Sequence, residues 1–311
     1  MTSAMMDRAN EVIAKTYKRF PVVITRGSGC TLWDDTGKRY TDFVAGIAVC
    51  NLGHAHPKIA EALAAQARTL WHVSNLFYTV PQMELAAWLT AHSFADRVFF
   101  CNSGAEANEA AIKLTRKYFK EAGQGERFRI ISMEQSFHGR TMATLSATGQ
   151  EKVKHGFEPL LEGFDFAPFD DLAGLRAKIG PATAAVMLEP VQGEGGVRCP
   201  RPDYLKQVRA LCDEAGLLLI FDEIQTGMGR TGTLFAYEHS GVRPDIMTLA
   251  KALANGLPMG AMLAREQVAA AFGPGAHAST FGGTPIVSAA ALEVFRTMER
   301  DGILEQTRAI S

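Results

Sequence analysis

The strongest constraint on the fold of this chain is the alternation of short apolar runs with amphipathic stretches. The apolar runs are nearly continuous, which is typical of strands buried on both faces of a parallel sheet. The amphipathic stretches predict helices that cover those faces, so the pattern predicts an α/β fold with a mainly parallel sheet. The expected strands are residues 97–101, 129–133, 184–189, 217–222, 246–250 and 259–264.

The expected helices follow from the amphipathic periodicity and from prolines that suit a first helical turn. They are residues 57–70, 81–91, 105–120, 203–215, 265–272 and a helix from Pro285 to about Arg300. The N-terminal region differs, because residues 31–43 predict two short strands joined by a turn at Asp35-Thr36-Gly37.

Composition excludes several classes of function. The chain has 32 Lys+Arg against 33 Asp+Glu, so it predicts no basic surface for nucleic acid or an anionic membrane. The five cysteines are scattered and form no C-x-x-C pair, which argues against a disulfide framework or a zinc site. No signal-peptide core is found at the N-terminus, and the longest apolar run, 216–221, is far shorter than the ~20 residues of a membrane span. We therefore expect a cytoplasmic protein without a metal site.

The loops that follow the expected strands are where an open parallel sheet binds its ligand. After 97–101, Ser103 and Gly104 stand where a helix begins, and its free backbone N–H groups favour an anion. Taken alone, this motif fits a plain N-cap better, with Glu106 completing a capping box. After 129–133, Phe137 could stack on a flat cofactor and Arg140 could grip a carboxylate, although a packed loop with a surface arginine also explains them.

Three later strand ends add carboxylates and a lysine. Glu189 and Glu194 lie in a glycine-rich loop and either pair with an arginine or face solvent. The glycines of this loop do not follow the G-x-G-x-x-G pattern of a dinucleotide site. Asp222 ends an apolar strand, where a carboxylate needs a partner or caps a turn. Lys251 also ends an apolar strand, and its amine either reaches water or serves as a partly desolvated nucleophile.

The joint occurrence of these groups is more informative than any one of them. Five strand ends offer an anion cradle, an aromatic ring with an arginine, a carboxylate pair, a buried aspartate and a lysine. Pyridoxal phosphate needs a phosphate anchor, a ring stack, an anion beside its ring nitrogen and a lysine that captures its aldehyde. The sequence therefore predicts a pyridoxal-phosphate enzyme.

At these residues the chain resembles class III aminotransferases of the fold-type I pyridoxal-phosphate superfamily. The resemblance extends from about Tyr17 to the end of the chain. It is strongest in GIAVCNLGHAHP (46–57), HVSNLFYTVPQ (72–82), CNSGAEANEAAIKLTRKY (101–118), SFHGRT (136–141), EPVQGEGG (189–196), FDEIQTGMGRTG (221–232), LAKAL (249–253) and STFGGTP (279–285).

The resemblance implies a role for each matching residue. Ser103, Gly104 and Ala105 would hold the phosphate, and Phe137 would stack on the ring. Asp222 would pair with the ring nitrogen, Gln225 would lie near the phenolic oxygen, and Lys251 would form the Schiff base and move the proton. Arg140 would hold the substrate carboxylate, and Glu194 would pair with a second arginine. Thr280 would contact the phosphate in the other subunit, which implies a homodimer with shared active sites.

The resemblance also implies a domain division and a reaction. Residues 1–55 would begin a small α+β domain, 56–285 would form the large cofactor-binding domain, and 286–311 would begin a C-terminal part that we expect to be incomplete. The implied reaction moves the terminal amino group of N2-acetyl-L-ornithine to 2-oxoglutarate, giving N-acetylglutamate 5-semialdehyde and glutamate in arginine biosynthesis. Ile47 stands where ornithine-specific enzymes have a tyrosine, which disfavours ornithine. Succinylornithine, N-succinyl-diaminopimelate, ornithine and 4-aminobutyrate stay open as donors, as does an inactive form that binds the cofactor.

Overall fold

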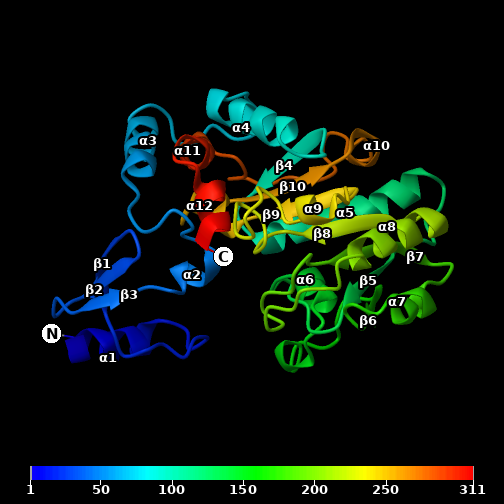
Figure 1. Ribbon diagram of the computed structural model, residues 1–311, viewed down its shortest axis with the longest axis horizontal. Helices are drawn as coiled ribbons and strands as arrows, with labels where there is room; N and C mark the ends of the chain where they lie inside the picture. Colours follow the sequence, from blue (N-terminus) through cyan, green and yellow to red (C-terminus); the bar gives the residue numbers. More distant parts are fainter. Residues whose placement is uncertain (1, 311) are drawn as a thin grey trace.

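A seven-stranded sheet forms the centre of the chain, and the computed structural model describes residues 2–310. The strand order across the sheet is β4-β10-β9-β8-β7-β5-β6 (Figure 1). The strands are β4 (Arg97–Cys101), β5 (Arg129–Met133), β6 (Phe164–Ala167), β7 (Thr183–Leu188), β8 (Leu218–Asp222), β9 (Ile246–Leu249) and β10 (Gly260–Ala264). The prediction of an α/β fold with a mainly parallel sheet is confirmed.

Strand β10 corrects the expectation that residues 259–264 join the sheet in parallel. It pairs antiparallel with both β9 and β4, whereas β5 to β9 are mutually parallel. Two parallel strands need a crossover connection of a dozen or more residues. The segment 250–259 between β9 and β10 is shorter than that and contains only the short turn η2 (Lys251–Ala254). Because β4 runs in the direction of β9, the predicted strand ends still share one edge of the sheet.

Helices cover both faces of the sheet. One face packs against α5 (Gly104–Glu121), α6 (Met142–Ala147) and α10 (Glu266–Ala269). The other packs against α4 (Val80–Ala91), α7 (Leu172–Lys178), α8 (Tyr204–Ala215) and α11 (Pro285–Arg300). The expected helices are present, although the one expected at 265–272 is shortened to α10. Helices α6 and α7 and the strand β6 lie where no element was expected. Within residues 2–310, no helix is long and apolar enough to cross a membrane.

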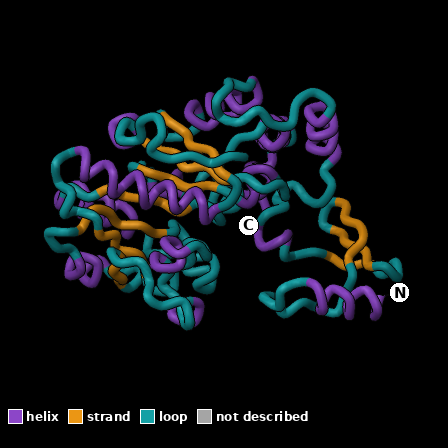
Figure 2. The backbone as a smooth tube through the Cα atoms, turned by 180° about the vertical axis from the view of Figure 1, so that it is seen from behind, coloured by secondary structure: helices purple, strands orange, loops and turns teal. Residues whose placement is uncertain are grey.

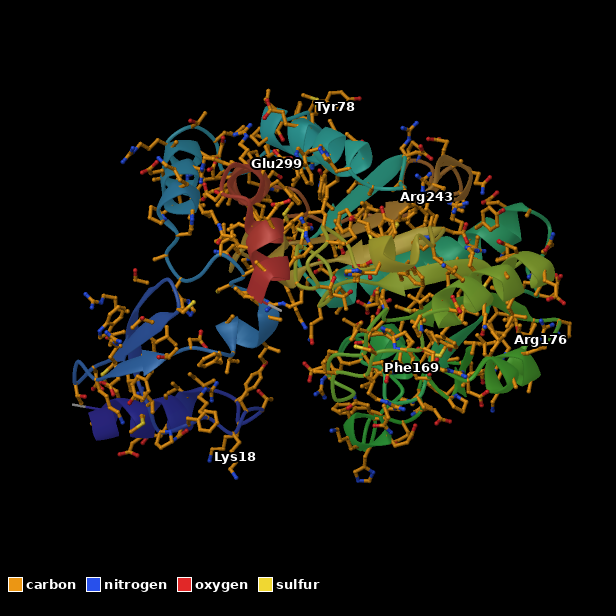
Figure 3. The ribbon with its side chains drawn as sticks, in the orientation of Figure 1. Lys18, Tyr78, Phe169, Arg176, Arg243 and Glu299 are labelled. Atoms are coloured by element: carbon orange, nitrogen blue, oxygen red, sulfur yellow. The ribbon has the colours of Figure 1, made fainter. Side chains whose placement is uncertain are left out.

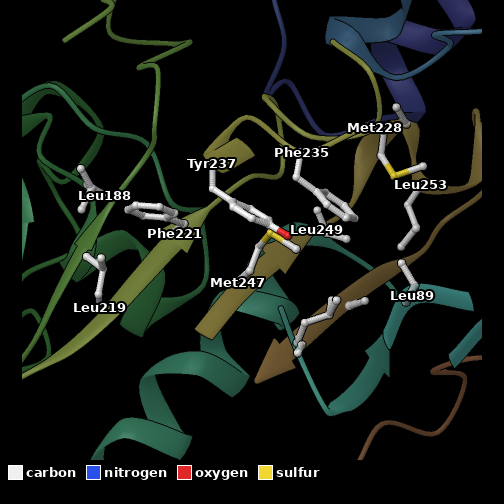
Figure 4. Close-up of a cluster of buried hydrophobic side chains, with 14 of the residues drawn as sticks. Leu89, Leu188, Leu219, Phe221, Met228, Phe235, Tyr237, Met247, Leu249 and Leu253 are labelled. Atoms are coloured by element: carbon white, nitrogen blue, oxygen red, sulfur yellow. The ribbon is translucent and has the colours of Figure 1, made fainter. Parts of the chain in front are cut away.

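The alternation of side chains along β8 assigns its residues to the two cores. Leu219 and Phe221 belong to the core beneath α4, α8 and α11, part of which is drawn in Figure 4. Leu218 and Ile220 belong to the core beneath α5. Because side chains alternate with a period of two, Asp222 lies on the α5 face at the end of its strand. Its position on this face determines which side chains Asp222 contacts.

The N-terminal region forms a separate layer. A three-stranded antiparallel sheet contains β1 (Ile24–Ser28), β2 (Thr31–Asp34) and β3 (Arg39–Thr41), preceded by α1 (Thr2–Val12). The predicted pair of strands around Asp35-Thr36-Gly37 is confirmed. Both views show this unit to one side of the central sheet, joined to it through the short turn α2 (Ala45–Ala48) and α3 (Pro57–Ala67) (Figures 1 and 2).

The C-terminal helices pack onto the central domain. Residues of α11, among them Val294 and Phe295, share one apolar core with Leu85 and Leu89 of α4. A last helix, α12 (Ile303–Ile310), follows α11 and contacts it. The division of the chain at 1–55, 56–285 and 286–311 stays a prediction.

Candidate active site

A cavity of about 430 Å³ opens at the carboxyl edge of the parallel strands. Loops that follow β4, β5, β7, β8 and β9 line it together, as expected for an open parallel sheet. Most of the residues singled out from the sequence lie on its wall. They are Ser103, Gly104, Ala105, Phe137, Arg140, Glu194, Asp222, Gln225 and Lys251.

The start of α5 supplies the anion-binding end of this cavity. Ser103 is the N-cap of the helix, and its Oγ accepts a hydrogen bond from the Glu106 N–H at 3.2 Å. Glu106 reaches back to the Asn102 N–H at 2.6 Å, so the predicted capping box is shifted by one residue. The Gly104 and Ala105 N–H groups find no acceptor within residues 2–310. Capping and anion binding are therefore compatible here, because the cap uses the third N–H and leaves the first two for a ligand.

Asp222 is held by three hydrogen bonds at the floor of the cavity. Its side chain is buried, and Oδ2 accepts from His138 Nδ1 at 2.7 Å and from Asn108 Nδ2 at 2.8 Å. Its Oδ1 accepts from the Ile224 N–H at 3.1 Å. Burial alone lowers the pKa of His138, but the hydrogen bond to Asp222 and the charges of Asp222 and Glu189 outweigh burial and raise it. The contact with Asp222 therefore favours the protonated form of the His138 imidazole.

Lys251 begins the turn η2, directly beyond β9, with its amine in the cavity. Burial lowers the pKa of the Lys251 ammonium, while the carboxylates of Asp222, Glu194 and Glu189 act in the opposite direction. The net effect is a lowered pKa, so more of the amine is neutral at a given pH than for a lysine in water. A neutral amine is the form that attacks an aldehyde or accepts a proton.

The glycine-rich loop after β7 joins two walls of the cavity. Glu189 is almost fully buried, and its two oxygens accept from the Phe137 N–H and the Gly193 N–H, each at 3.2 Å. Burial raises the pKa of the Glu189 carboxyl to about 7. A Cβ atom on Gly193 would lie 1.9 Å from Oε1 of Gln225, so only glycine permits this approach of the loop.

The mouth of the cavity carries the two residues predicted to bind substrate. Arg140 is exposed, and its Cζ lies 5.5 Å from the centroid of the Phe137 ring. Glu194 is exposed as well. Within residues 2–310 neither side chain forms an ion pair. Both charges are therefore accessible to a ligand at the entrance.

Thr280 does not reach this cavity. It lies in a separate surface depression beside Asn75, Gln82 and Gly282. The Asn75 amide donates to the carbonyls of Ser279 and Gly282 at 3.1 and 3.0 Å, which holds the two loops of this surface together. The predicted role of Thr280 toward a second subunit stays a prediction.

The structure adds residues that the sequence did not single out. His138 and Asn108 both contact Asp222. The apolar wall contains Val49 and the segment Leu257–Met259. One signal was available for Asn108, because it is a polar residue among the alanines of the buried face of α5. No such pattern marks Val49, which comes from the N-terminal region.

The chemistry of these groups fits pyridoxal phosphate. The free N–H groups at the start of α5 suit its phosphate, and the cavity offers the Phe137 ring as a surface for its ring. Asp222 offers a carboxylate held by other donors, which suits a protonated ring nitrogen. Lys251 offers an amine of lowered pKa for its aldehyde.

Comparison with known proteins agrees with this chemistry. Residues 12–311 match the family described as aminotransferase class-III. The chain is 53% identical to an acetylornithine aminotransferase of Myxococcus xanthus over 307 residues, covering 99% of this chain and 77% of the relative. It is 57% identical to an acetylornithine aminotransferase of Gloeobacter violaceus over 296 residues, covering 95% and 74%.

Solved structures show the same likeness. The ornithine aminotransferase of Toxoplasma gondii superposes with a TM-score of 0.94 at 35% identity, over 97% of this chain and 72% of that one. A second structure of that enzyme has PLP in partial occupancy at its active site. The acetylornithine aminotransferase of Elizabethkingia anophelis gives a TM-score of 0.86 at 36% identity, over 98% and 74%. This chain therefore belongs to the class III aminotransferases, which are enzymes that depend on pyridoxal phosphate.

Proposed function

We propose that this enzyme transfers the terminal amino group of N2-acetyl-L-ornithine to 2-oxoglutarate, giving N-acetylglutamate 5-semialdehyde and glutamate in the cytoplasmic synthesis of arginine. The observation that carries the proposal is the identity of 53 and 57% to two acetylornithine aminotransferases over nearly the whole chain. The ornithine aminotransferase of Toxoplasma gondii superposes well but is only 35% identical. Sequence identity therefore favours the acetylated donor.

The apolar wall of the cavity also favours an acylated donor. Val49 and Leu257–Met259 present no carboxylate. The free α-ammonium of ornithine would lose its hydration against such a wall without gaining a partner, whereas an acylamide is neutral. Succinylornithine and N-succinyl-diaminopimelate share this property. They stay alternatives, because the wall does not select between acyl groups.

Two side chains of the cavity, Lys251 and Asp222, take part in the chemical steps of the proposed reaction. Bound pyridoxal phosphate supplies an electron sink for the electron pair left on the substrate carbon. Lys251 Nζ would take the proton from that carbon and pass it to the cofactor, and its lowered pKa keeps part of the amine neutral for this purpose. The Asp222 carboxylate lies at the floor of the cavity, where it would pair with a protonated ring nitrogen.

The remaining residues position the reactants. Ser103, Gly104 and Ala105 hold the phosphate at the start of α5, and Phe137 and Gln225 hold the ring. Arg140 binds a substrate carboxylate at the mouth, where its guanidinium is exposed. Glu194 is also exposed and has no ion-pair partner within residues 2–310, so it is free to pair with an arginine from outside them. These assignments place all charged partners of the substrate at the entrance.

The test of the proposed function is a comparison of amino donors. Glutamate formed from 2-oxoglutarate is measured with N2-acetyl-L-ornithine, N2-succinyl-L-ornithine, L-ornithine and 4-aminobutyrate. We expect kcat/KM for an acylated donor to exceed that for ornithine by at least about 100-fold, or ~2.7 kcal/mol. Equal or higher kcat/KM with ornithine or 4-aminobutyrate would overturn the assignment while leaving the enzyme class intact.

We also propose that the enzyme is a homodimer with shared active sites. The surface that carries Thr280 is rich in exposed apolar side chains. Leu76 is 85% and Tyr78 92% exposed, and the tilted rings of Phe281 and His72 have centroids 5.2 Å apart. Tyr78 lies at the outer surface beside the start of α4 (Figure 3). Apolar groups gathered in this way favour burial by a partner. A second copy is the partner that would bring Thr280 to a phosphate.

A further inference from the structure

Asn108, on α5, contacts three other elements at the floor of the active site. Its side chain has no exposed surface and projects from the second turn of α5 toward the sheet. The Nδ2 group donates to Asp222 Oδ2 on β8 at 2.8 Å and to the His138 carbonyl at 2.7 Å. Its Oδ1 accepts from Thr248 Oγ1 on β9 at 2.8 Å. One amide therefore joins α5, β8, β9 and the loop that follows β5.

The parity of the sheet explains why these groups meet. Asp222 and Thr248 are neighbours in the parallel pair of β8 and β9, so their side chains point to the same face. That face is the one covered by α5. Ala107, Ala110 and Ala111, which flank Asn108 on the helix, are small and let α5 lie close to the strands. Asn108 is thus the polar group of α5 that reaches the end of β8.

The orientation of the Asn108 amide is fixed by its partners. A carboxylate oxygen and a backbone carbonyl only accept hydrogen bonds, so the NH₂ group must face Asp222 and His138. The Thr248 hydroxyl then donates to the oxygen on the other side. Every hydrogen-bonding position of the amide toward these neighbours is used, which leaves one allowed arrangement.

This arrangement fixes the orientation of the Asp222 carboxylate. Oδ2 has two donors, His138 Nδ1 and Asn108 Nδ2, while Oδ1 has one donor from the backbone of Ile224. An oxygen of a carboxylate accepts two hydrogen bonds, so Oδ1 keeps one position open. Because Asp222 lines the cavity, that position is the one available to a ligand. A turn of the carboxylate would break at least one of the three bonds.

We infer that Asn108, held by Thr248, is a positioning residue that aims the Asp222 carboxylate at the ring nitrogen of the cofactor. The inference rests on the proposed role of Asp222. Asn108 acts through Asp222 and through the loop that carries Phe137 and Arg140, since its second hydrogen bond ends on the carbonyl of His138. It therefore links the helix that begins at the phosphate site to the group that meets the ring.

The first test replaces Asn108 by aspartate, which has the same shape. At high pH the new carboxylate would face Asp222 Oδ2 at the distance of a hydrogen bond, and the repulsion would turn or displace Asp222. When the new group holds a proton, it donates one hydrogen bond and restores part of the arrangement. A residue that only fills space would show no such dependence on pH.

The probe for this test is pyridoxamine 5′-phosphate, which has the same ring nitrogen and phosphate but no aldehyde for Lys251. Its dissociation constant is measured by fluorescence between pH 6 and pH 8. At pH 8 we expect Asn108→Asp to bind the probe at least about tenfold more weakly than the wild type does. The ratio of their dissociation constants should decrease toward pH 6. The ratio of the two constants is used, because His138, Asp222, Glu189 and Lys251 face this region in both proteins.

A second pair of variants keeps the test valid if Asn108→Asp does not fold. Thr248→Val removes the donor to Asn108 Oδ1 and conserves shape. Thr115→Val is the matched control, because Thr115 lies on α5, is also fully buried, and bonds only to the Ala111 carbonyl of its own helix. We expect Thr248→Val to weaken probe binding about three- to tenfold and Thr115→Val to leave it unchanged, although both lower the melting temperature.

Two results would overturn the inference. One is a constant ratio of dissociation constants between pH 6 and pH 8 for folded Asn108→Asp. The other is equal probe binding by Thr248→Val and Thr115→Val. Both results require a wild-type protein that binds the probe and transfers amino groups. A wild type that does neither would contradict the proposed function itself, so this outcome is distinguishable from a failure of the inference about Asn108.

Discussion

Lys251 is the side chain whose surroundings are most unusual for its type. Lysine is rarely buried without a partner, yet within residues 2–310 the amine of the partly buried Lys251 forms no hydrogen bond or ion pair. Its backbone has a φ of 48°, in the region that non-glycine residues seldom adopt. A desolvated amine and a strained backbone at one residue cost stability, and both persist only where the surrounding structure enforces them. This is the environment of a residue selected for chemistry.

Lys251→Ala should abolish covalent attachment of pyridoxal phosphate and lower turnover by about a thousandfold or more. Borohydride reduction followed by peptide mass spectrometry checks the attachment. Lys154→Ala is the control, because Lys154 is also buried but is ion-paired with Glu151 at 3.1 Å, away from the cavity. A labelled peptide in the Lys251 variant, or none in the Lys154 variant, would contradict the assignment.

Glu223, the neighbour of Asp222, has a structural role that should appear as pH dependence. It is buried, and its oxygens accept from the Ala236 N–H at 2.6 Å, the Tyr237 N–H at 2.8 Å and Thr226 Oγ1 at 3.2 Å. Burial raises the pKa of Glu223 from 4.5 to about 7. Between these two values the folded chain keeps a proton that the unfolded chain loses. The stability of the folded state therefore falls as the pH rises through this window.

Glu223→Gln should remove this contribution. The free energy of unfolding of the wild type, relative to the variant, should fall by up to about 3 kcal/mol between pH 4.5 and pH 8. Urea unfolding at several pH values measures the difference. Glu126→Gln removes an exposed carboxylate that does not act on Glu223 and serves as the control. The same slope in both variants would argue against a special role for Glu223.

At the level of single residues, the sequence was most informative where chemistry follows a strand. The residues predicted at five strand ends meet in one cavity, because the carboxyl ends of parallel strands share an edge. Asn108 and His138 were not singled out, since each is important through a contact with Asp222, which is distant from both in the sequence. Val49 was missed for the same reason, as it reaches the cavity from the N-terminal region.

At the level of elements, the buried helices and strands were predictable and the irregular ones were not. α11 begins at Pro285 and ends at Arg300, as its proline and periodicity indicate. β6 was not expected because FDFA is short and alternates polar with apolar residues. The turn α2 contains Ala45, Ile47 and Ala48 with positive φ, a conformation that the sequence signals only where glycine occurs. Tertiary contacts decide such segments.

Gly260, on β10, lies where this strand closely approaches the start of α5. A Cβ atom here would lie 2.3 Å from the carbonyl oxygen of Ser103, the residue that caps α5. Gly260→Ala should therefore shift the phosphate-binding end of α5, lowering stability by about 1–3 kcal/mol and weakening cofactor binding. Gly180→Ala is the control, since a methyl group at Gly180 would have no neighbour within 4 Å. Unfolding and cofactor titration check both; equal effects would mean that the contact with Ser103 is unimportant.

At the level of the whole molecule, the distribution of apolar surface argues for assembly. The central sheet is covered on both faces, whereas the surface around Leu76, Tyr78 and Phe281 stays exposed. The N-terminal region exposes Phe43, Val44 and Ile47 in addition. Exposed groups of this size cost free energy in water unless a partner covers them. Thr280 lies on the first of these surfaces, outside the cavity of its own chain.

Mixed dimers can test whether a site uses residues of two subunits. Thr280→Asp places a negative charge where the proposed dimer brings a phosphate, and Lys251→Ala removes the reactive amine. Each variant alone should be nearly inactive. In a mixed dimer, the Lys251 of the Thr280→Asp chain would face the intact Thr280 of the other chain, which gives one complete site. If chains associate at random, half of the dimers are mixed and each has one complete site of two, so activity should recover to about one quarter of the wild type.

The measurement is the activity after equal amounts of the two variants are refolded together, with the dimer confirmed by light scattering. No recovery in mixed dimers would mean that Thr280 serves the site of its own chain, because sites confined to one chain stay broken in every combination. A Thr280→Asp variant that is active by itself would mean that Thr280 serves no site.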